Sequence, residues 1–305
     1  MKRASIQTVL ERYQVRKTPL QKQEFRAYLE THAKKFGYEI NLQKYSKKGH
    51  NLIIGDPETA KLILTAHYDT PPNFFLPIVA SVGGIIPWTL SQLVPLIPLL
   101  AILAIPRTLI RNPLAASIVS EIFLIGYLIQ MLAGIANKHN ANDNTSGVAL
   151  LLSLLEDLPT ELRETVCFVF FDDEEKGLIG ASKFKRAFKE KIQNTPLINF
   201  DCVAHGKHFV FSAKKSFRES EISGMLQQSI KETLSAENYS YGSALQHIYT
   251  SDQLHFKTSV GVAAAHQLPL IGPVLNRIHT CRDTKFDENN IETLKKLMVD
   301  LIRKL

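Results

Sequence analysis

The sequence predicts an α/β protein: a mixed, mostly parallel sheet flanked by helices and carrying an inserted apolar helical hairpin. Three observations lead to this prediction. Short β-branched and apolar runs alternate along the chain with stretches of helical periodicity. Several of these runs end directly in a histidine or an acidic residue. Two long segments between residues 70 and 136 are almost free of charged side chains, which indicates the insertion.

The N-terminal part is expected to form a helix followed by three strands. Residues 5–37 carry apolar side chains at helical spacing. Residues 38–42 and 51–55 are predicted strands, joined by a turn rich in lysine and glycine. The run 61–66 is short and apolar, as a buried strand requires, and it ends at His67.

The C-terminal part continues the alternation. It contains helices at 147–158, 219–235 and 289–304, one more helix before residue 197, and strands at 165–171, 197–201, 209–212 and 260–265. In such folds, ligands collect at the carboxyl ends of the parallel strands. His67, the pair Glu174-Glu175 and Asp201 each lie at such an end, which favours a functional site over surface charge.

Length and composition set the broad class of the protein. Its 305 residues suit one large domain, or one domain that carries an insertion. A hydrophobic share of 45% is that of a globular protein, and 21% charged residues argues against general disorder. The three cysteines form no CxxC pair, which favours a reducing compartment over a disulfide framework. No secretory signal is visible at the N-terminus, so we expect the catalytic part to face the cytoplasm.

The net charge of +7 is concentrated in the first 50 residues. They hold 12 Lys and Arg against 4 Asp and Glu, a charge of +8, which leaves −1 for the remainder. Such a basic face suits an anionic membrane surface or a solvated helical surface. Since no zinc finger or aromatic-interleaved basic motif accompanies it, no nucleic-acid partner is expected.

Residues 70–136 do not follow the alternation of strands and helices. Residues 70–106 contain no charged side chain, and residues 114–136 contain a single acidic one. The second segment has about the length that crosses a hydrocarbon core of roughly 30 Å. We therefore expect 70–136 to be an inserted hairpin that associates with the membrane, within a catalytic domain made of 1–69 and 137–305. The alternative is a soluble cytoplasmic protein in which the segment is a lid or joins two subunits of an oligomer.

Five short motifs, each with a carboxylate or an imidazole, follow one another in an order that would build a two-metal hydrolytic site. Each motif alone is weak, because a lone histidine or acidic turn is usually structural. Their joint order carries the hypothesis. The motifs are His67-Tyr-Asp69, Asn142-Asp143-Asn144, Glu174-Glu175, Asn199-Phe-Asp201, and His279-Thr with Asp283 four residues on.

A dizinc centre needs one terminal histidine and one terminal carboxylate for each ion, a bridging carboxylate and an open water position. The chain supplies this set once. His67 and Asp201 are assigned to one zinc ion. Glu175 and His279 are assigned to the other, and Asp143 bridges the two.

Two further carboxylates are given catalytic roles. Glu174 is adjacent to a ligand but is not one itself, so it is the candidate general base that takes a proton from the attacking water. Asp69 lies two residues from His67 and is expected to accept the second ring N–H of that histidine, which fixes its tautomer.

These motifs resemble those of the dinuclear zinc aminopeptidases related to bacterial leucyl aminopeptidases and glutamate carboxypeptidase II. The matching stretches are 66–70, 141–147, 170–180, 199–201, 251–252 and 279–284. The resemblance implies a zinc-exopeptidase α/β fold and the ligand roles given above. This chain differs from the family in the segment 70–140, which is far longer than the usual link between the first histidine and the bridging aspartate.

The resemblance also implies an activity: removal of one residue from a peptide with a free N-terminus. Members of the family often use a tyrosine or histidine to stabilise the oxyanion, and Tyr249 is the candidate here. Two alternatives stay open. One is a glutaminyl-cyclase-like acyl transferase on a related fold, which uses a single zinc ion; the other is a non-catalytic membrane scaffold derived from such an enzyme. The complete ligand set favours the peptidase.

Overall fold

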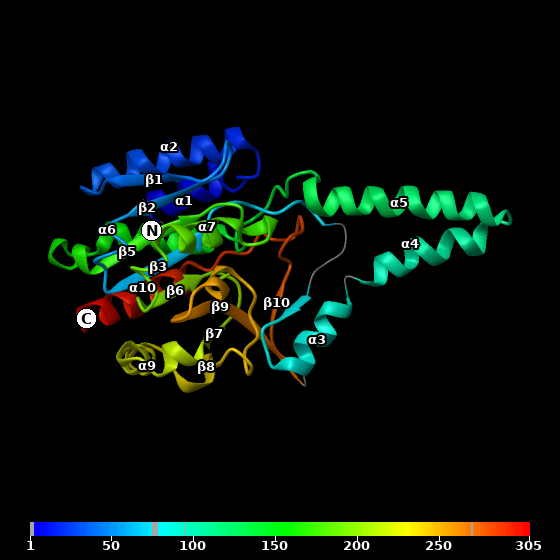
Figure 1. The fold of residues 1–305 in the computed structure, drawn as a ribbon. Helices are drawn as coiled ribbons and strands as arrows, with labels where there is room; N and C mark the ends of the chain where they lie inside the picture. Colours follow the sequence, from blue (N-terminus) through cyan, green and yellow to red (C-terminus); the bar gives the residue numbers. More distant parts are fainter. Residues whose placement is uncertain (1–2, 75–78, 95, 270) are drawn as a thin grey trace.

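The structure, a computed structural model, describes residues 3–74, 79–94, 96–269 and 271–305, and its strands form one sheet (Figure 1). The strands are β1 (Ile40–Lys44), β2 (His50–Ile54), β3 (Leu62–His67), β4 (Val79–Ser81), β5 (Val166–Phe171), β6 (Leu197–Phe200), β7 (His208–Ala213), β8 (Tyr239–Ser243), β9 (Ser259–Leu268) and β10 (Gly272–Asn276). Among the described residues the sheet has ten strands, in the order β1-β2-β5-β3-β6-β9-β10-β4. β7 pairs with β9, and β8 pairs with β7.

The central strands of the sheet are parallel. β5, β3, β6 and β9 are joined by parallel pairing, whereas the pairs toward the two edges, β1–β2 and β10–β4, are antiparallel. β3, β5 and β6 are buried along their whole length, as expected for apolar strands covered on both faces. The predicted mixed sheet with a parallel centre is therefore confirmed, and the carboxyl ends of these strands lie at one edge.

Helices cover both faces of the sheet. Successive side chains of a strand point to opposite faces, so Leu62 and Leu64 of β3 join one core cluster and Ile63 joins another. Helices α1 (Ala4–Arg12), α2 (Pro19–Lys35), α6 (Thr145–Asp157), α8 (Lys215–Arg218), α9 (Glu221–Thr233) and α10 (Glu288–Arg303) contribute to the first cluster, and α7 (Ile179–Phe188) to the second. Short 3-10 turns lie at η1 (Thr160–Thr165), η2 (Glu174–Lys176), η3 (Ala236–Asn238) and η4 (Asp252–His255).

Local capping explains where two of these helices begin. The prediction of one helix over residues 5–37 is wrong, because the chain breaks between α1 and α2. Thr18 and Gln21 form a capping box there, and Pro19 occupies the first helical position. At the start of α6, the Asn144 side chain accepts a hydrogen bond of 2.9 Å from the amide of Gly147. This cap places the preceding residue, Asp143, at the N-terminal end of the helix.

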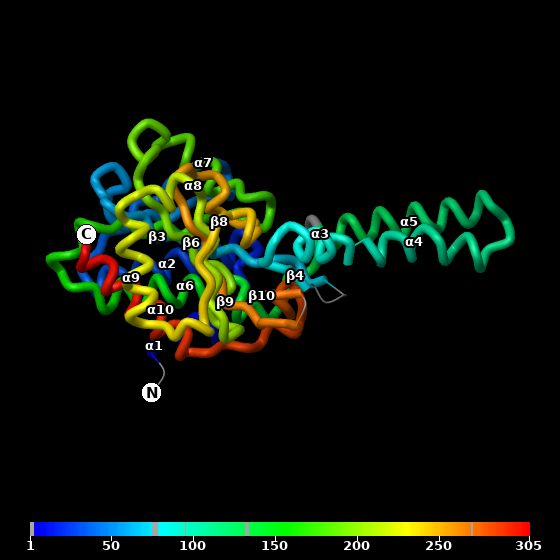
Figure 2. Tube along the Cα trace, turned by 90° about the horizontal axis from the view of Figure 1, so that it is seen from below, coloured from blue at the N-terminus to red at the C-terminus, as the bar shows by residue number. Residues whose placement is uncertain are grey.

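The apolar segment forms the three helices α3 (Ile85–Leu93), α4 (Leu96–Leu109) and α5 (Pro113–Ala133). α4 and α5 lie against each other and project away from the body of the protein that contains the sheet (Figures 1 and 2). Their large apolar side chains are exposed; Leu100 and Ile122 are 64% and 63% accessible. The predicted apolar helical insertion is confirmed. The stretches Ile85–Leu109 and Pro113–Met131 are long and apolar enough to cross a membrane, by length and composition alone.

Both ends of the insertion contact the body of the protein that contains the sheet. Pro72 and Ala136 form an isolated antiparallel β-bridge, so the two ends lie side by side. β4 pairs with β10, with Ser81 opposite Val274. The insertion therefore contributes an edge strand to the sheet as well as the projecting hairpin, and the sequence did not predict this strand.

Candidate metal centre

The five predicted metal ligands converge at the carboxyl edge of the parallel strands. They lie on segments that are far apart in the sequence but end at the same place in the fold. These segments are the end of β3 (His67), the residue before the cap of α6 (Asp143), the turn η2 after β5 (Glu175), the residue after β6 (Asp201) and the loop after β10 (His279).

The carboxylate of Asp143 lies between the two histidines. Its Oδ1 is 3.4 Å from Nε2 of His67, and its Oδ2 is 2.9 Å from Nε2 of His279. Each histidine also has a carboxylate of its own. His67 Nε2 lies 3.5 Å from Oδ1 of Asp201, and His279 Nε2 lies 3.5 Å from Oε2 of Glu175. These contacts pair His67 with Asp201 and His279 with Glu175, which are the pairs that the sequence analysis assigned.

The donor set fits zinc. Two donors that each lie about 2.0–2.2 Å from one tetrahedral ion are roughly 3.4 Å apart, close to the separations within each set. Buried polar atoms also lack partners: among the described residues, Glu175 Oε1, Asp201 Oδ1 and His279 Nδ1 accept or donate no hydrogen bond. Imidazole nitrogens and carboxylate oxygens are the ligands found at catalytic zinc sites.

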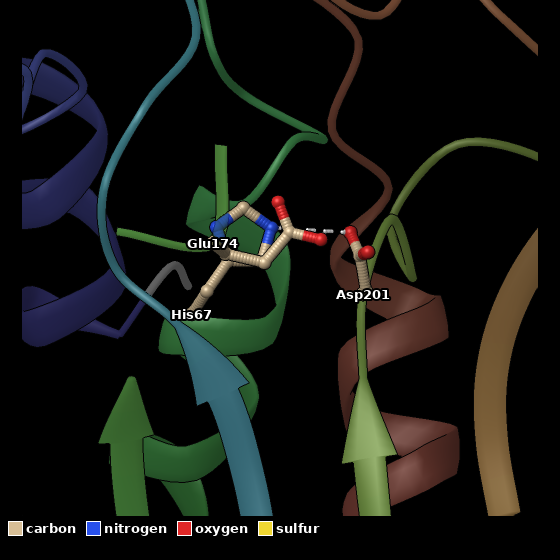
Figure 3. A group of neighbouring side chains, drawn as sticks. All are labelled: His67, Glu174 and Asp201. Carbon is tan, nitrogen blue, oxygen red and sulfur yellow. Dashed lines mark ion pairs between the residues drawn. The ribbon is translucent and has the colours of Figure 1, made fainter. Parts of the chain in front are cut away.

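Glu174 lies beside the ligands. Ligand atoms of His67, Glu174 and Asp201 lie within 4.8 Å of one another, as do those of His67, Asp143 and Glu175. Figure 3 shows the Glu174 carboxylate next to the His67 ring and facing Asp201. Glu174 is half-buried, and it lines a cavity together with Asp143, Glu175 and Asp201. It is therefore close enough to exchange a proton with a water molecule held between these groups.

The crowded carboxylates shift the acid–base properties of the site. Burial raises the pKa of Glu174 well above its usual value, and the charges of Asp252 and Asp201 add to this rise. Burial and neighbouring carboxylates raise the pKa of Glu175 in the same way. Burial alone lowers the pKa of His67, but the Glu174 and Asp201 carboxylates outweigh it and hold this pKa well above its usual value. Several buried carboxylates at one place repel one another, and they favour positive charge nearby, as the raised pKa of His67 shows. A bound cation would relieve this repulsion.

Asp69 positions the turn that carries the two glutamates. Its Oδ1 accepts a hydrogen bond of 2.9 Å from the amide of Glu174, and its Oδ2 accepts one of 3.2 Å from the amide of Glu175. The predicted contact with His67 is longer: Nδ1 of the ring lies 3.6 Å from Asp69 Oδ1 and 3.2 Å from the main-chain oxygen of the same residue. The nearer acceptor for the ring is thus the main chain, while the carboxylate fixes η2.

Two further aspartates belong to the site. Both carboxylate oxygens of Asp283 accept hydrogen bonds of 2.9 Å, from the amides of Asn142 and Asp143, so Asp283 orients the central carboxylate. Burial raises the pKa of Asp283 to about 8. Asp252 is fully buried, and neither of its carboxylate oxygens has a hydrogen-bond partner among the described residues. The motif Ser251-Asp252 was the sequence signal for Asp252, but its position beside Glu174 follows only from the fold.

Two cations from the N-terminal region lie beneath the site. Lys22 of α2 is buried and pairs with Asp172 and, at 2.8 Å, with Asp173. Arg16 is fully buried and donates to the main-chain oxygens of Tyr13 and Tyr68. Both side chains offset part of the negative charge of the strand-end motifs. The sequence did not reveal them, because most of the basic residues around them are solvated.

His279 is held in an uncommon backbone conformation. Its φ is +57°, in the left-handed region that non-glycine residues seldom adopt. Its main-chain oxygen accepts a hydrogen bond of 2.7 Å from the amide of Phe74, and the ring centroids of the two residues are 5.2 Å apart. The first residues of the insertion therefore help to fix a candidate ligand.

The cavity that Glu174 lines, of about 280 Å³, contains four of the candidate ligands in its lining. The cavity is lined by Asp143, Glu174, Glu175, Asp201 and His279, and also by Val79, Trp88 and Gln92 from the insertion. Tyr249 also lines this cavity, where its hydroxyl donates a hydrogen bond of 3.0 Å to the main-chain oxygen of Asp201. The insertion thus forms part of the candidate active site.

Comparison with solved structures gives the fold. A glutaminyl cyclase from Porphyromonas gingivalis is 17% identical over 98% of this chain and 97% of its own, with a TM-score of 0.62. LapA of Legionella pneumophila is 14% identical over 98% of this chain and 71% of its own, with a TM-score of 0.58. BSAP, a zinc aminopeptidase from Bacillus subtilis, is 15% identical over 84% of this chain and 49% of its own, with a TM-score of 0.50. These similarities support the α/β fold predicted from the sequence.

Comparison of sequences gives the family. A search of curated proteins finds no match. Residues 129–302 match peptidase family M28, a span that includes four of the five candidate ligands and Glu174 and leaves out His67, Asp69 and most of the apolar insertion. Because the match covers more than half of the 305 residues, this chain is a member of peptidase family M28.

Proposed function

We propose that the chain is a co-catalytic dizinc metallopeptidase, and specifically an aminopeptidase. The observation that carries this proposal is the position of Asp143, whose two carboxylate oxygens lie 3.4 and 2.9 Å from the two histidines. Each histidine has a separate terminal carboxylate. A site for a single ion would not need both sets.

In this proposal His67, Asp201 and Asp143 hold one zinc ion, and His279, Glu175 and Asp143 hold the other. When bound, the ions supply the Lewis acidity that activates a water molecule and polarises the peptide carbonyl. The chain's own residues supply the proton transfer and the positioning.

Glu174 is the proposed general base and proton shuttle. It takes the proton of the attacking water and delivers it to the amine that leaves. Asp69 holds the main chain of Glu174 and Glu175, so both carboxylates keep a fixed direction. Tyr249 is proposed as the hydrogen-bond donor to the oxyanion. For this role its hydroxyl has to give up its hydrogen bond to the main-chain oxygen of Asp201 and donate to the substrate oxygen instead.

The substrate is proposed to be a peptide with a free N-terminus. The cavity of about 280 Å³ suits one residue rather than a long segment, so we expect the first residue of the peptide to lie beside Glu174. We expect the purified protein to shorten unblocked peptides by one residue and to leave N-acetylated copies of the same peptides intact. Mass spectrometry of the products measures this. Cleavage of the acetylated peptides, or trimming from the carboxyl end, would contradict the aminopeptidase proposal.

A glutaminyl cyclase is the second candidate, favoured by the similarity to the Porphyromonas gingivalis enzyme over nearly the full length of both chains. The same assay separates the two activities when a peptide with N-terminal glutamine is included. A cyclase releases ammonia and leaves the peptide at full length, whereas an aminopeptidase releases glutamine. Counting zinc per chain adds an independent test, and a non-catalytic scaffold would process none of the peptides.

We also propose that residues 70–136 attach the catalytic domain, made of 1–69 and 137–305, to the cytoplasmic face of a membrane. The 21 residues of α5 correspond to about 30 Å of helix, which is the thickness of a hydrocarbon core. The apolar side chains of α4 and α5 face outward, where water would leave them unfavourably exposed. Arg107 and Arg111 lie near the tip of the hairpin, where they can meet lipid headgroups.

Replacing residues 96–131 with a flexible glycine-serine linker tests the attachment. This variant removes α4 and most of α5 but keeps β4 and α3, which line the catalytic cavity. We expect it to fractionate as a soluble protein without detergent, and to keep its zinc and its activity on short peptides. Full-length protein that is wholly soluble and monodisperse without detergent would rule the attachment out. A soluble oligomer that the linker variant converts to a monomer would assign the hairpin to subunit contacts instead.

A further inference from the structure

A second cavity adjoins the catalytic cavity. It has a volume of about 230 Å³ and lies between α3 and the edge of the sheet formed by β4 and β10. Ile86, Leu90 and Val94 line it from the helix side, and Ile271 and Val274 line it from the sheet side. Residues of the insertion therefore build most of this cavity.

Helix α3 separates the two cavities. Trp88 and Gln92, four residues apart, line the catalytic cavity. Ile86 and Leu90, also four residues apart, line the second cavity. Residues at this spacing share one face of a helix, so α3 presents a different face to each cavity. The partition is thin, because Val79, Ser81 and Ser91 line both cavities.

The second cavity is apolar. Ser81 and Ser91 are the polar residues that line it, and no charged side chain lines it among the residues that the structure describes. Its volume lies below the roughly 300–1,000 Å³ of pockets that hold small-molecule ligands. One or two hydrocarbon side chains suit this space better than a cofactor does.

We propose that this second cavity is a substrate subsite for an apolar side chain on the carboxyl side of the cleaved bond. The inference rests on the proposed aminopeptidase function and adds a substrate class to it, namely peptides whose residues after the first are apolar. A peptide with its first residue beside Glu174 continues past the shared wall, where its next side chains meet Leu90. Because most of the lining residues come from the insertion, this preference depends on the insertion rather than on the ligand set.

A pair of variants on one helix turn tests the subsite. Leu90 lines the second cavity and is 59% exposed, whereas Leu93 lines neither cavity and is 50% exposed. Leu90→Asn and Leu93→Asn therefore make the same change at similar exposure. Full-length protein in one detergent is assayed on two unblocked peptides with the same first residue, followed by leucines in one and by glycines in the other.

The readout is the ratio of kcat/KM for the leucine peptide to that for the glycine peptide. An apolar subsite of this kind is worth on the order of ten-fold or more, so we expect a ratio of about that size in the unmodified protein. Leu90→Asn is expected to lower this ratio to near one, whereas Leu93→Asn is expected to leave it unchanged. A ratio near one in the unmodified protein, or an equal loss in both variants, overturns the subsite while the peptidase function stands. Failure to hydrolyse either peptide overturns the peptidase function itself.

Discussion

Glu174→Gln is expected to lower kcat by about 10²–10⁴-fold, the usual contribution of a well-placed general base. Glutamine keeps the size of the side chain and leaves the main-chain hydrogen bonds of residue 174 in place, but it cannot accept the proton of the attacking water. Zinc content and the KM for an unblocked peptide are expected to change little, because the proposed ligands are all retained. Steady-state kinetics and elemental analysis of the same preparation measure both quantities.

The matched control is Glu164→Gln, which makes the same chemical change at an exposed position of η1. It is expected to behave like the unmodified protein. Loss of zinc from Glu174→Gln would mean that Glu174 is a ligand and that its role and that of Glu175 are interchanged. Unchanged turnover would remove Glu174 from the mechanism.

Asp143→Ala is expected to lose both zinc ions and to lower hydrolysis by roughly 10³-fold or more, because the metal contribution to the transition state is several kcal/mol. The reason lies in the geometry: Asp143 alone among the five candidate ligands lies within 3.5 Å of both histidines. Removing it leaves each histidine with one carboxylate, too few protein ligands for a stable catalytic site.

Asp201→Ala is the comparison that isolates the bridging role. Asp201 approaches His67 and belongs to one set of ligands. Its removal is therefore expected to reduce zinc toward one ion per chain, whereas Asp143→Ala reduces it toward none. Two tightly bound ions and normal hydrolysis in Asp143→Ala would make the whole assignment wrong. Equal zinc loss in the two variants would contradict the bridging role.

The local sequence determined the parts of this protein that depend on short-range chemistry. Short runs of apolar, β-branched or aromatic residues, such as 61–66 and 165–171, indicated buried strands, because a strand covered on both faces buries its side chains on each of them. His67 and Asp201 could be placed at strand ends because each directly follows an apolar run in the sequence. Parallel strands bring such ends to one edge of the sheet. The absence of charge from residue 70 to residue 106 likewise marked the insertion without any knowledge of the fold.

Other features were decided only by the tertiary structure. β4 became a strand because β10, nearly 200 residues later, offers an edge to pair with, and a three-residue run carries no periodicity of its own. Lys22 has the sequence context of a surface lysine, and only the packing of α2 over the strand ends brings it to Asp172. The contacts of Asp69 with the amides of Glu174 and Glu175, and the position of Asp252 close enough to raise the pKa of Glu174, likewise depend on residues distant in the sequence.

The wall of the catalytic cavity is the clearest case. The sequence separated the insertion from the catalytic domain because hydropathy reports composition, and composition differs sharply between them. The fold joins them, since the bridge between Pro72 and Ala136 and the pairing of β4 with β10 bring α3 to the ligands. The residues that would do the chemistry were thus legible in the sequence, whereas the surface that would select the substrate arises from long-range pairing that no local pattern encodes.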